Sequence, residues 1–196
     1  MDNNNKPAKF CYPYPHAAIT ADCIVFGYDP NKTLRVLLVK RRNEPYKDCW
    51  AFPGGFMEIG EDLETCARRE VMEETGMALG EVFQFRSYSA VDRDPRERVI
   101  TVVHFAFEAL AEVKGSDDAA EARWFDIDNL PELAFDHRTI IHELFEFLED
   151  VIYNDLFFKY SPEGIPMDAL SKLTTDILHL KELERPPTDD DTLEDR

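Results

Sequence analysis

The chain has 196 residues, 44% of them hydrophobic, so it can bury the core of one domain and still carry an extension. Its formal charge of −18 argues against duplex nucleic acid or an anionic membrane as the main partner, because both attract clustered lysine and arginine. It contains no run of about 18 apolar residues, which leaves a membrane span without support.

The four cysteines lack the C-x-x-C spacing of zinc sites and do not suggest a disulfide framework. The chain also lacks a positively charged N-terminal region followed by an apolar run, so a secretory signal is not indicated. We therefore expect a reducing, cytoplasmic environment.

The first fifteen residues are rich in asparagine, lysine and proline and predict an extended arm, residues 1–15. Tyr12 and Tyr14 could stack on a nucleotide base, or the arm could pack on its own domain or on a second subunit. The apolar stretch 16–26 predicts a buried strand, and residues 34–39 are expected to form its hairpin partner.

Arg41 and Arg42 follow this hairpin and precede the segment 50–55. Because a guanidinium group can bind phosphate oxygens through two parallel hydrogen bonds, this pair is a candidate for substrate binding. Solvated surface charge is the alternative.

A turn at residues 53–55 leads into a helix expected from about Asp62 until Gly76, where glycine suits a C-cap. One edge of this helix has apolar residues at i, i+4 and i+8 spacing and is expected to pack. The neighbouring edge carries three carboxylates within an arc of about 100° and is expected to stay in solvent. These carboxylates belong to Glu70, Glu73 and Glu74.

Three glutamates near the negative end of the helix dipole repel one another, so the bare helix is electrostatically unfavourable. A hard divalent cation would relieve this repulsion, and Mg²⁺ suits an open carboxylate cluster that also meets substrate phosphates. Glu61 and Arg69 are expected to form an ion pair that ties the preceding loop to the helix. That pair would direct the backbone carbonyl near Gly55 toward the same metal.

The segment 55–77 has the spacing G-x5-E-x7-R-E-U-x-E-E-x-G-U, where U is apolar. Every defined place is filled, by Gly55, Glu61, Arg69, Glu70, Val71, Glu73, Glu74, Gly76 and Met77. The chain therefore resembles a Nudix hydrolase from about residue 17 to 148, whereas a solvated acidic helix is the alternative. The resemblance implies an α/β fold in which a mixed β-sheet is sandwiched between helices (α/β/α).

The same resemblance implies which residues act. Glu70 and Glu74 would ligate Mg²⁺, with Mn²⁺ as a possible substitute, and the Gly55 carbonyl would join them. Glu73 would share that work or act on the attacking water. Glu61 and Arg69 would have a structural role.

A strand expected over residues 82–90 leads into a loop with three arginines, Arg93, Arg96 and Arg98, before the strand 99–107. A solvated hairpin loop is one interpretation. The Arg-Asp-Pro-Arg segment is, however, similar to that of Nudix enzymes acting on ADP-ribose and of related ADP-ribose-sensing regulators. We therefore regard these arginines as candidate ligands of phosphate or ribose.

An acidic loop precedes the strand expected over residues 122–125, and in relatives a loop here brings in a further carboxylate. Asp118 is the nearest match, and Glu121 is the second candidate. His104, inside an alternating strand, is expected to be a sheet residue and not a catalyst. Asp136 is expected to cap a helix reaching about Asp150.

These elements define a Nudix domain over residues 16–150. A helical extension over 151–181, with a helix from about Pro166 to Leu180, and a disordered acidic tail over 182–196 are expected to follow.

The expected activity is Mg²⁺-dependent hydrolysis of a nucleoside diphosphate linked to another moiety, with ADP-ribose cleaved to AMP and ribose 5-phosphate. The alternatives are a pyrophosphohydrolase of oxidised nucleoside triphosphates and an ADP-ribose-sensing transcription regulator. The acidic C-terminal segment argues against a full DNA-binding module. The resemblance also implies a homodimer.

Overall fold

The computed structural model describes residues 13–29, 34–115, 119–154, 157–160 and 167–184. The expected arm and tail lie largely outside these ranges, together with Tyr12 and Asp118. No helix in the described ranges combines the length and apolar character needed to cross a membrane.

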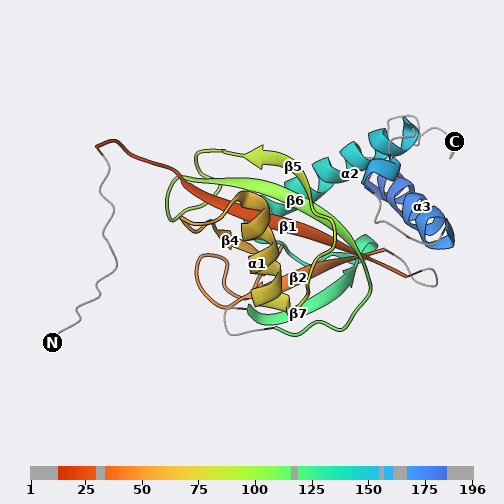
Figure 1. The fold of residues 1–196 in the computed structure, drawn as a ribbon, viewed down its shortest axis with the longest axis horizontal. Helices are drawn as coiled ribbons and strands as arrows, with labels where there is room; N and C mark the ends of the chain where they lie inside the picture. The colour runs from red at the N-terminus through yellow and green to blue at the C-terminus, as the bar shows by residue number, and fades with distance from the viewer. Residues whose placement is uncertain (1–12, 30–33, 116–118, 155–156, 161–166, 185–196) are drawn as a thin grey trace, which may run out of the picture.

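A mixed seven-stranded sheet forms the centre of the molecule (Figure 1). The order β3-β2-β1-β6-β5 is completed by β4 on β1 and β7 on β2. The strands are β1 (Ala18–Tyr28), β2 (Arg35–Arg41), β3 (Trp50–Ala51), β4 (Gly54–Phe56), β5 (Phe83–Tyr88), β6 (Val99–Ala109) and β7 (Ala119–Asp126). β1 and β6 run parallel along their full length, whereas β1 and β2 pair antiparallel, which confirms the expected hairpin.

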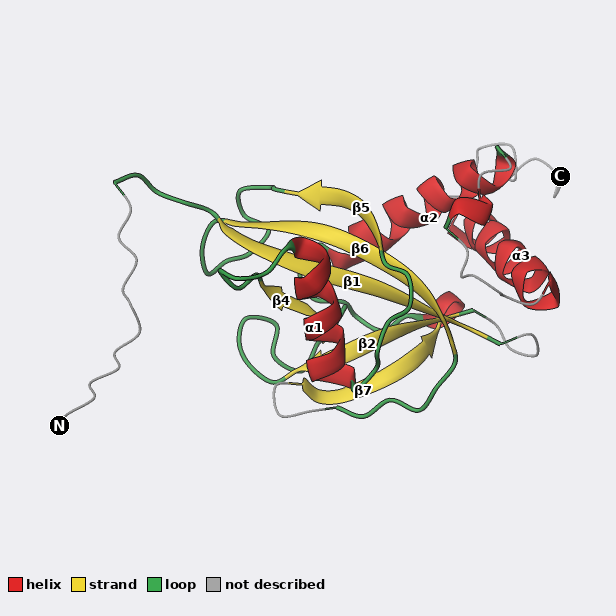
Figure 2. Ribbon diagram, in the orientation of Figure 1, coloured by secondary structure: helices red, strands yellow, loops and turns green. Residues whose placement is uncertain are grey.

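Side chains of β1 alternate between two cores because successive residues of a strand point to opposite faces of the sheet. Cys23 and Val25 pack with Ala67 and Val71 of α1 (Leu63–Thr75). Ile24 and Phe26 pack on the other face, with α2 (His137–Tyr153). The sheet therefore lies between helices, and the expected α/β/α arrangement is confirmed (Figure 2).

The third helix, α3 (Met167–Glu184), extends the core beside α2. Leu173 and Ile177 are buried in it, and Asp176 Oδ2 accepts a 2.8 Å hydrogen bond from the backbone N–H of Leu34. Two short 3₁₀ helices, η1 (Ile127–Asn129) and η2 (Phe157–Lys159), connect the larger elements. The expected helix near Pro166 is thus present and ends four residues later than Leu180.

Two expectations about α2 need correction. The helix continues to Tyr153 instead of ending near Asp150, because Val151 still packs into the apolar core. Asp136 occupies the N-cap position, but its side chain does not cap the helix. Its carboxylate is engaged instead by the Arg93 guanidinium, in an ion pair of 2.7 Å.

Candidate active site

The helix α1 begins and ends where local chemistry requires. The Asp62 carboxylate accepts a 2.8 Å hydrogen bond from the backbone N–H of Thr65, which satisfies one of the free donors of the first turn. Gly76 ends the helix in the left-handed region, with φ of 72°. The expected start and end of this helix are confirmed.

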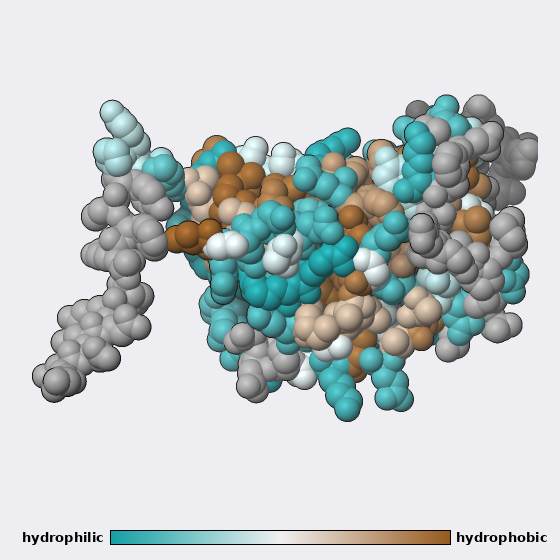
Figure 3. Space-filling view, in the orientation of Figure 1, coloured by the Kyte–Doolittle hydropathy of each residue, from teal (hydrophilic) through white to brown (hydrophobic). Residues whose placement is uncertain are grey.

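The surface around α1 is hydrophilic (Figure 3), and the three glutamates of this helix line a cavity beside it. The expectation that all three stay in solvent was wrong for Glu70, because only 14% of its side chain is exposed. Glu74 Oε2 accepts a 3.0 Å hydrogen bond from the Gly54 N–H. Glu70 Oε1 lies 2.8 Å from Arg69 Nη1. Glu73 is the most open, with 57% of its side chain exposed.

Arg69 connects the loop before α1 to the glutamates. Its Nη2 and Nε donate to the two carboxylate oxygens of Glu61 at 2.6 and 3.0 Å, so the expected ion pair is present. Its Nη1 contacts both Glu70 and Glu73, and Nη2 also donates to the Phe56 carbonyl at 3.1 Å. The Arg69 guanidinium and the Glu58 N–H lower the pKa of Glu61 to about 2.

The two glycines of β4 allow the carboxylates to approach the backbone. A Cβ on Gly55 would lie 2.4 Å from Glu70 Oε1, and a Cβ on Gly54 would lie 2.5 Å from Asp22 Oδ1. The Gly55 carbonyl accepts a 3.8 Å hydrogen bond from the Cys66 thiol. Any larger residue at either position would push a carboxylate away from β4.

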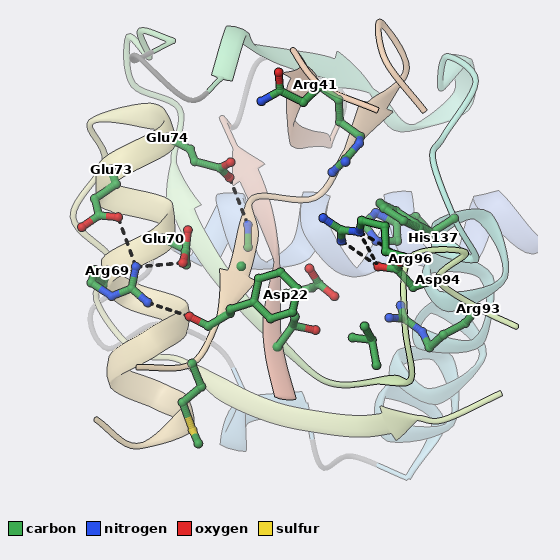
Figure 4. A pocket seen from close by; sticks show the side chains of 18 of the residues that line it. Asp22, Arg41, Arg69, Glu70, Glu73, Glu74, Arg93, Asp94, Arg96 and His137 are labelled. Atoms are coloured by element: carbon green, nitrogen blue, oxygen red, sulfur yellow. Dashed lines mark hydrogen bonds and ion pairs between the residues drawn. The ribbon is translucent and has the colours of Figure 1, made fainter. Parts of the chain in front are cut away.

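A cavity of about 620 Å³ separates the glutamates from a wall of arginines (Figure 4). α1 and β4 form one side, and the loop before β6 together with the start of α2 forms the other. Of the expected site residues, the cavity brings together Arg41, Gly55, Arg69, Glu70, Glu73, Glu74, Arg93 and Arg96.

The arginines of this wall differ in how many of their guanidinium donors already form hydrogen bonds. Arg93 is 4% exposed and forms a two-bond ion pair with Asp136. Arg96 binds Asp94 through Nε and Nη2, which leaves Nη1 without a hydrogen bond among the described residues. Arg41 donates only its Nε, to the Pro45 carbonyl at 2.9 Å.

Arg41 and Arg96 both lie near the Phe135 ring, with guanidinium carbons 4.7 and 6.0 Å from its centroid. Burial lowers the pKa of Arg41, and the nearby positive charge of Arg96 lowers it further. Two guanidinium groups whose positive charges repel each other at one wall of a cavity make a favourable position for an anion.

Other expected residues lie elsewhere. Arg42 lines a smaller neighbouring cavity of about 80 Å³ and not the main one. Arg98 donates to the carbonyls of Ser89 and Ala90, and Glu121 is paired with Arg123 on β7. His104 is buried on β6 and does not line the cavity. The remaining candidate carboxylate, Asp118, falls outside the described residues.

Sequence reasoning missed several residues that line the cavity, among them Asp22, Phe135 and His137. A usable signal existed for Asp22, because a carboxylate inside an otherwise apolar strand requires a special environment. Phe135 and His137 gave no comparable signal: Phe135 adopts a positive φ of 54°, which only the folded structure reveals.

The electrostatics of the acidic wall fit a bound cation. Burial raises the pKa of Glu74 to about 8, helped by the negative charges of Glu70 and Asp22, and burial also raises the pKa of Glu70. Carboxylate and carbonyl oxygens are the ligands that Mg²⁺ prefers. In the described residues no three His, Cys, Asp or Glu side chains yet converge on one point. Arg69 donates to the carboxylates of Glu70 and Glu73. A cation that binds these two carboxylates would have to displace its guanidinium group from them.

A family model described as NUDIX domain matches residues 18–144, which is more than half of the chain. The chain belongs to the Nudix hydrolase family. This membership confirms the expected enzyme class, a hydrolase that acts on a phosphoanhydride.

Two curated relatives of this Nudix hydrolase are informative. An ADP-ribose pyrophosphatase from Methanocaldococcus jannaschii is 45% identical over 130 residues, covering 66% of this chain and 74% of the relative. The ADPR responsive transcriptional repressor NtrR from Acinetobacter baylyi is 34% identical over 139 residues, covering 67% of this chain. The match covers 54% of the repressor, so this chain spans about half of that relative's length.

A solved structure supports the same fold. The NUDIX domain of Shewanella oneidensis NrtR, in a complex with ADP ribose, superimposes with a TM-score of 0.64 at 28% identity. The superposition covers 69% of this chain and 90% of that domain. The described fold of this Nudix hydrolase is therefore shared with a domain crystallised with ADP ribose.

Proposed function

We propose that this chain is a Mg²⁺-dependent pyrophosphohydrolase that cleaves ADP-ribose to AMP and ribose 5-phosphate. One observation carries the proposal: the carboxylates of α1 face Arg41 and Arg96 across a single cavity. A pyrophosphate needs a cation on one side and hydrogen-bond donors on the other, and this cavity offers sites for both. Its volume of about 620 Å³ falls in the range of small-molecule sites.

Glu70, Glu74 and the Gly55 carbonyl would hold the cation, and Glu73 would share that work or orient the attacking water. When bound, Mg²⁺ acts as a Lewis acid on a phosphoryl oxygen and lowers the pKa of a coordinated water. Mn²⁺ offers the same coordination chemistry and is a possible substitute. Glu61 holds Arg69 in place, and Arg69 in turn donates to the Phe56 carbonyl at the end of β4.

The arginine wall would bind the diphosphate. Neither Nη group of Arg41 forms a hydrogen bond among the described residues. Nη1 of Arg96 forms none there either. Arg93 would act indirectly, because its guanidinium joins the loop to Asp136 at the start of α2. Arg42 and Arg98 would contribute less, since neither lines the cavity.

Two observations favour ADP-ribose as the substrate. The first is the 45% identity to a pyrophosphatase named for ADP-ribose, together with a related domain crystallised with that ligand. The second is that Arg93, Asp94 and Arg96 of the Arg-Asp-Pro-Arg segment line the cavity, so this segment is in position to contact the ligand.

A second candidate is an ADP-ribose-sensing regulator, which is favoured by the similarity to the repressor from Acinetobacter baylyi. The complete set of glutamates on α1 supports hydrolysis over sensing alone. In addition, acidic residues outnumber basic ones after Val151, which is unfavourable for binding a polyanion. A gel-shift assay showing tight, sequence-dependent DNA binding would favour the regulator.

The deciding experiment is a hydrolysis screen with and without Mg²⁺, in which chromatography detects the nucleoside monophosphate products. The substrates are ADP-ribose, other nucleoside diphosphate sugars, dinucleotides and oxidised deoxynucleoside triphosphates. Metal-dependent preference for ADP-ribose supports the proposal. Preference for oxidised triphosphates would reject the substrate, activity without divalent metal would reject the mechanism, and inactivity on every substrate would favour the regulator.

We further propose a homodimer in the cytoplasm. The proposal of a dimer rests on family resemblance, and sedimentation at working concentration tests it, because a monomer would contradict it. The described cysteines Cys23, Cys49 and Cys66 are free thiols, as a reducing compartment would allow.

A further inference from the structure

Two polar side chains line the cavity without a part in the mechanism above. Asp22 on β1 is 8% exposed, and His137 at the start of α2 is 2% exposed. Among the described residues, no fully buried side-chain nitrogen or oxygen atom lacks a hydrogen-bond partner. Each of these two side chains keeps one polar atom without such a partner, so that atom is accessible from the cavity that the side chain lines.

Asp22 is held by one oxygen only. Its Oδ2 accepts a 2.5 Å hydrogen bond from the Thr101 hydroxyl on the neighbouring strand β6. Its Oδ1 lies against Gly54, where the absence of a Cβ leaves room for it. In Figure 4 the Asp22 carboxylate lies in the middle of the cavity, between the glutamates of α1 and the arginine wall.

The hydrogen bonds of His137 determine which of its nitrogens carries the proton. Nδ1 accepts a 3.1 Å hydrogen bond from the Phe52 N–H, and the ring stacks on the Phe52 ring at 4.6 Å. Burial lowers the pKa of His137, which favours the neutral ring. In a neutral ring whose Nδ1 is an acceptor, the proton must be on Nε2. Nε2–H is thus a donor without a partner in the described residues.

A hydroxyl group complements this pair, because a hydroxyl donates one hydrogen bond and accepts others. We propose that Asp22 and His137 form a subsite for a sugar hydroxyl of the substrate, with His137 Nε2–H donating to it and Asp22 Oδ1 accepting from it. This inference rests on the proposed function and assigns to it two specificity residues for a ribosyl group.

Other ligand groups fit the subsite less well. A phosphate would be repelled by the Asp22 carboxylate, and the free guanidinium donors lie on the arginine wall. A nucleobase stacks on flat apolar faces, and the Phe135 ring, 5.6 Å from the His137 ring, offers one beside the subsite. A hydroxyl donates and accepts through a single atom, so one hydroxyl can satisfy both free atoms, and the analogues below test it against a base.

Two variants each remove one proposed contact with the hydroxyl. Each keeps the hydrogen bond that the side chain forms within the protein. Asp22→Asn retains an oxygen for the Thr101 hydroxyl but removes the charged acceptor. His137→Asn retains an acceptor for the Phe52 N–H but removes the Nε2–H donor. We expect each variant to raise KM for ADP-ribose about tenfold or more, with kcat changed by less than about threefold. The Mg²⁺ concentration for half-maximal rate should not change for His137→Asn. For Asp22→Asn it should change by less than about threefold, because the Asp22 charge acts on Glu74 only at a distance.

Two substrate analogues identify the hydroxyl. The β-methyl ester of ADP lacks the distal ribose, and 2′,3′-dideoxyadenosine diphosphate ribose lacks the adenosine hydroxyls. With the analogue that lacks the hydroxyl bound in the subsite, the variants and the wild type should have the same KM. A loss that persists with both analogues would overturn the proposal in favour of a base contact. An Mg²⁺ requirement raised about tenfold or more would overturn it in favour of a metal ligand.

The matched control is His104→Asn, because His104 is also 2% exposed but lies on β6 outside the cavity lining. Its KM should stay within about twofold of wild type. If the wild-type protein does not hydrolyse ADP-ribose, the proposed function fails, and calorimetric titration of ADP-ribose in EDTA then tests the subsite by itself. Weaker binding by both variants would support it, whereas equal binding, or no binding to the wild type, would overturn it.

Discussion

The backbone N–H of Gly54 donates a 3.0 Å hydrogen bond to Glu74 Oε2, which joins β4 to the last turn of α1 at the acidic wall. Glu74→Gln keeps an oxygen for this bond and removes the negative charge. We expect kcat to fall by at least about 100-fold, because the cation loses a ligand while the fold is retained. Steady-state kinetics measure the loss, and circular dichroism checks the fold; near wild-type turnover would contradict the metal site.

Glu61→Gln should have a smaller effect than Glu74→Gln. The Glu61 carboxylate holds Arg69 through two hydrogen bonds but is not itself expected to bind the cation. Losing a group that orients metal ligands commonly costs about 10–100-fold in activity or metal affinity. We expect a loss of about tenfold, visible as a raised Mg²⁺ requirement. The assignment would be wrong if this variant lost more activity than Glu74→Gln at saturating Mg²⁺.

The raised pKa of Glu74 predicts a pH dependence of stability in the metal-free protein. Its pKa is about 8 in the folded protein against an ordinary value of 4.5, so the folded state binds the proton more tightly. The stabilisation from that proton is fully present below about pH 4.5 and is lost as the pH rises to about 8. In EDTA, the wild type should lose more stability over this interval than Glu74→Gln.

Chemical denaturation at several pH values measures this difference. Subtracting the Glu74→Gln curve removes the contributions of the other carboxylates, including Glu61, whose pKa is shifted in the opposite direction. Parallel curves for the two proteins would contradict the assignment. Adding Mg²⁺ to the wild type near pH 7 should release a proton, which calorimetry in buffers of different ionisation enthalpy can detect.

Arg41 and Arg42 are adjacent in sequence but should differ in effect. Only Arg41 lines the main cavity, with its Nη groups free of hydrogen bonds in the described structure. Losing one charge-assisted hydrogen bond to phosphate costs about 1.5–3 kcal/mol, which is about 10–150-fold in kcat/KM. Arg41→Ala should show this loss, and Arg42→Ala should lose less than about threefold. Arg35→Ala, which removes an exposed ion pair on the same strand, is the reference.

The contrast between these neighbours shows what could be predicted from sequence. The helix α1 was predictable from end to end, because its caps Asp62 and Gly76 and its apolar spacing are local features. The parallel pairing of β1 with β6 was not derivable from residue spacing, and family resemblance supplied the fold. Local composition also indicated two arginine clusters near the cavity.

Partners distant in sequence decided the rest. Arg93 is neutralised by Asp136, 43 residues away, whereas Arg96 is held by Asp94, two residues away. Nothing in the spacing of the arginines distinguishes these outcomes. Asp22 and His137 line the same cavity from elements more than 100 residues apart, so only the folded chain brings them together.

Gly54→Ala and Gly55→Ala should damage the protein in different ways. A Cβ on Gly54 would lie 2.6 Å from the Ala21 carbonyl oxygen, and a core strand cannot move away without losing its pairing. A Cβ on Gly55 would meet only the end of the Glu70 side chain, at 2.4 Å, and this side chain can rotate. Gly54→Ala should therefore lower the free energy of unfolding by about 2 kcal/mol or more.

Gly55→Ala should retain most of its stability and lose activity, because the displaced Glu70 carboxylate no longer faces the cation. Urea unfolding and steady-state kinetics on both variants separate the two effects. We expect the order of stability to be wild type, Gly55→Ala, Gly54→Ala. If Gly55→Ala were the less stable variant, β4 would move away from β1 more easily than the Glu70 side chain rotates. The proposed position of Glu70 at the cation would then be wrong.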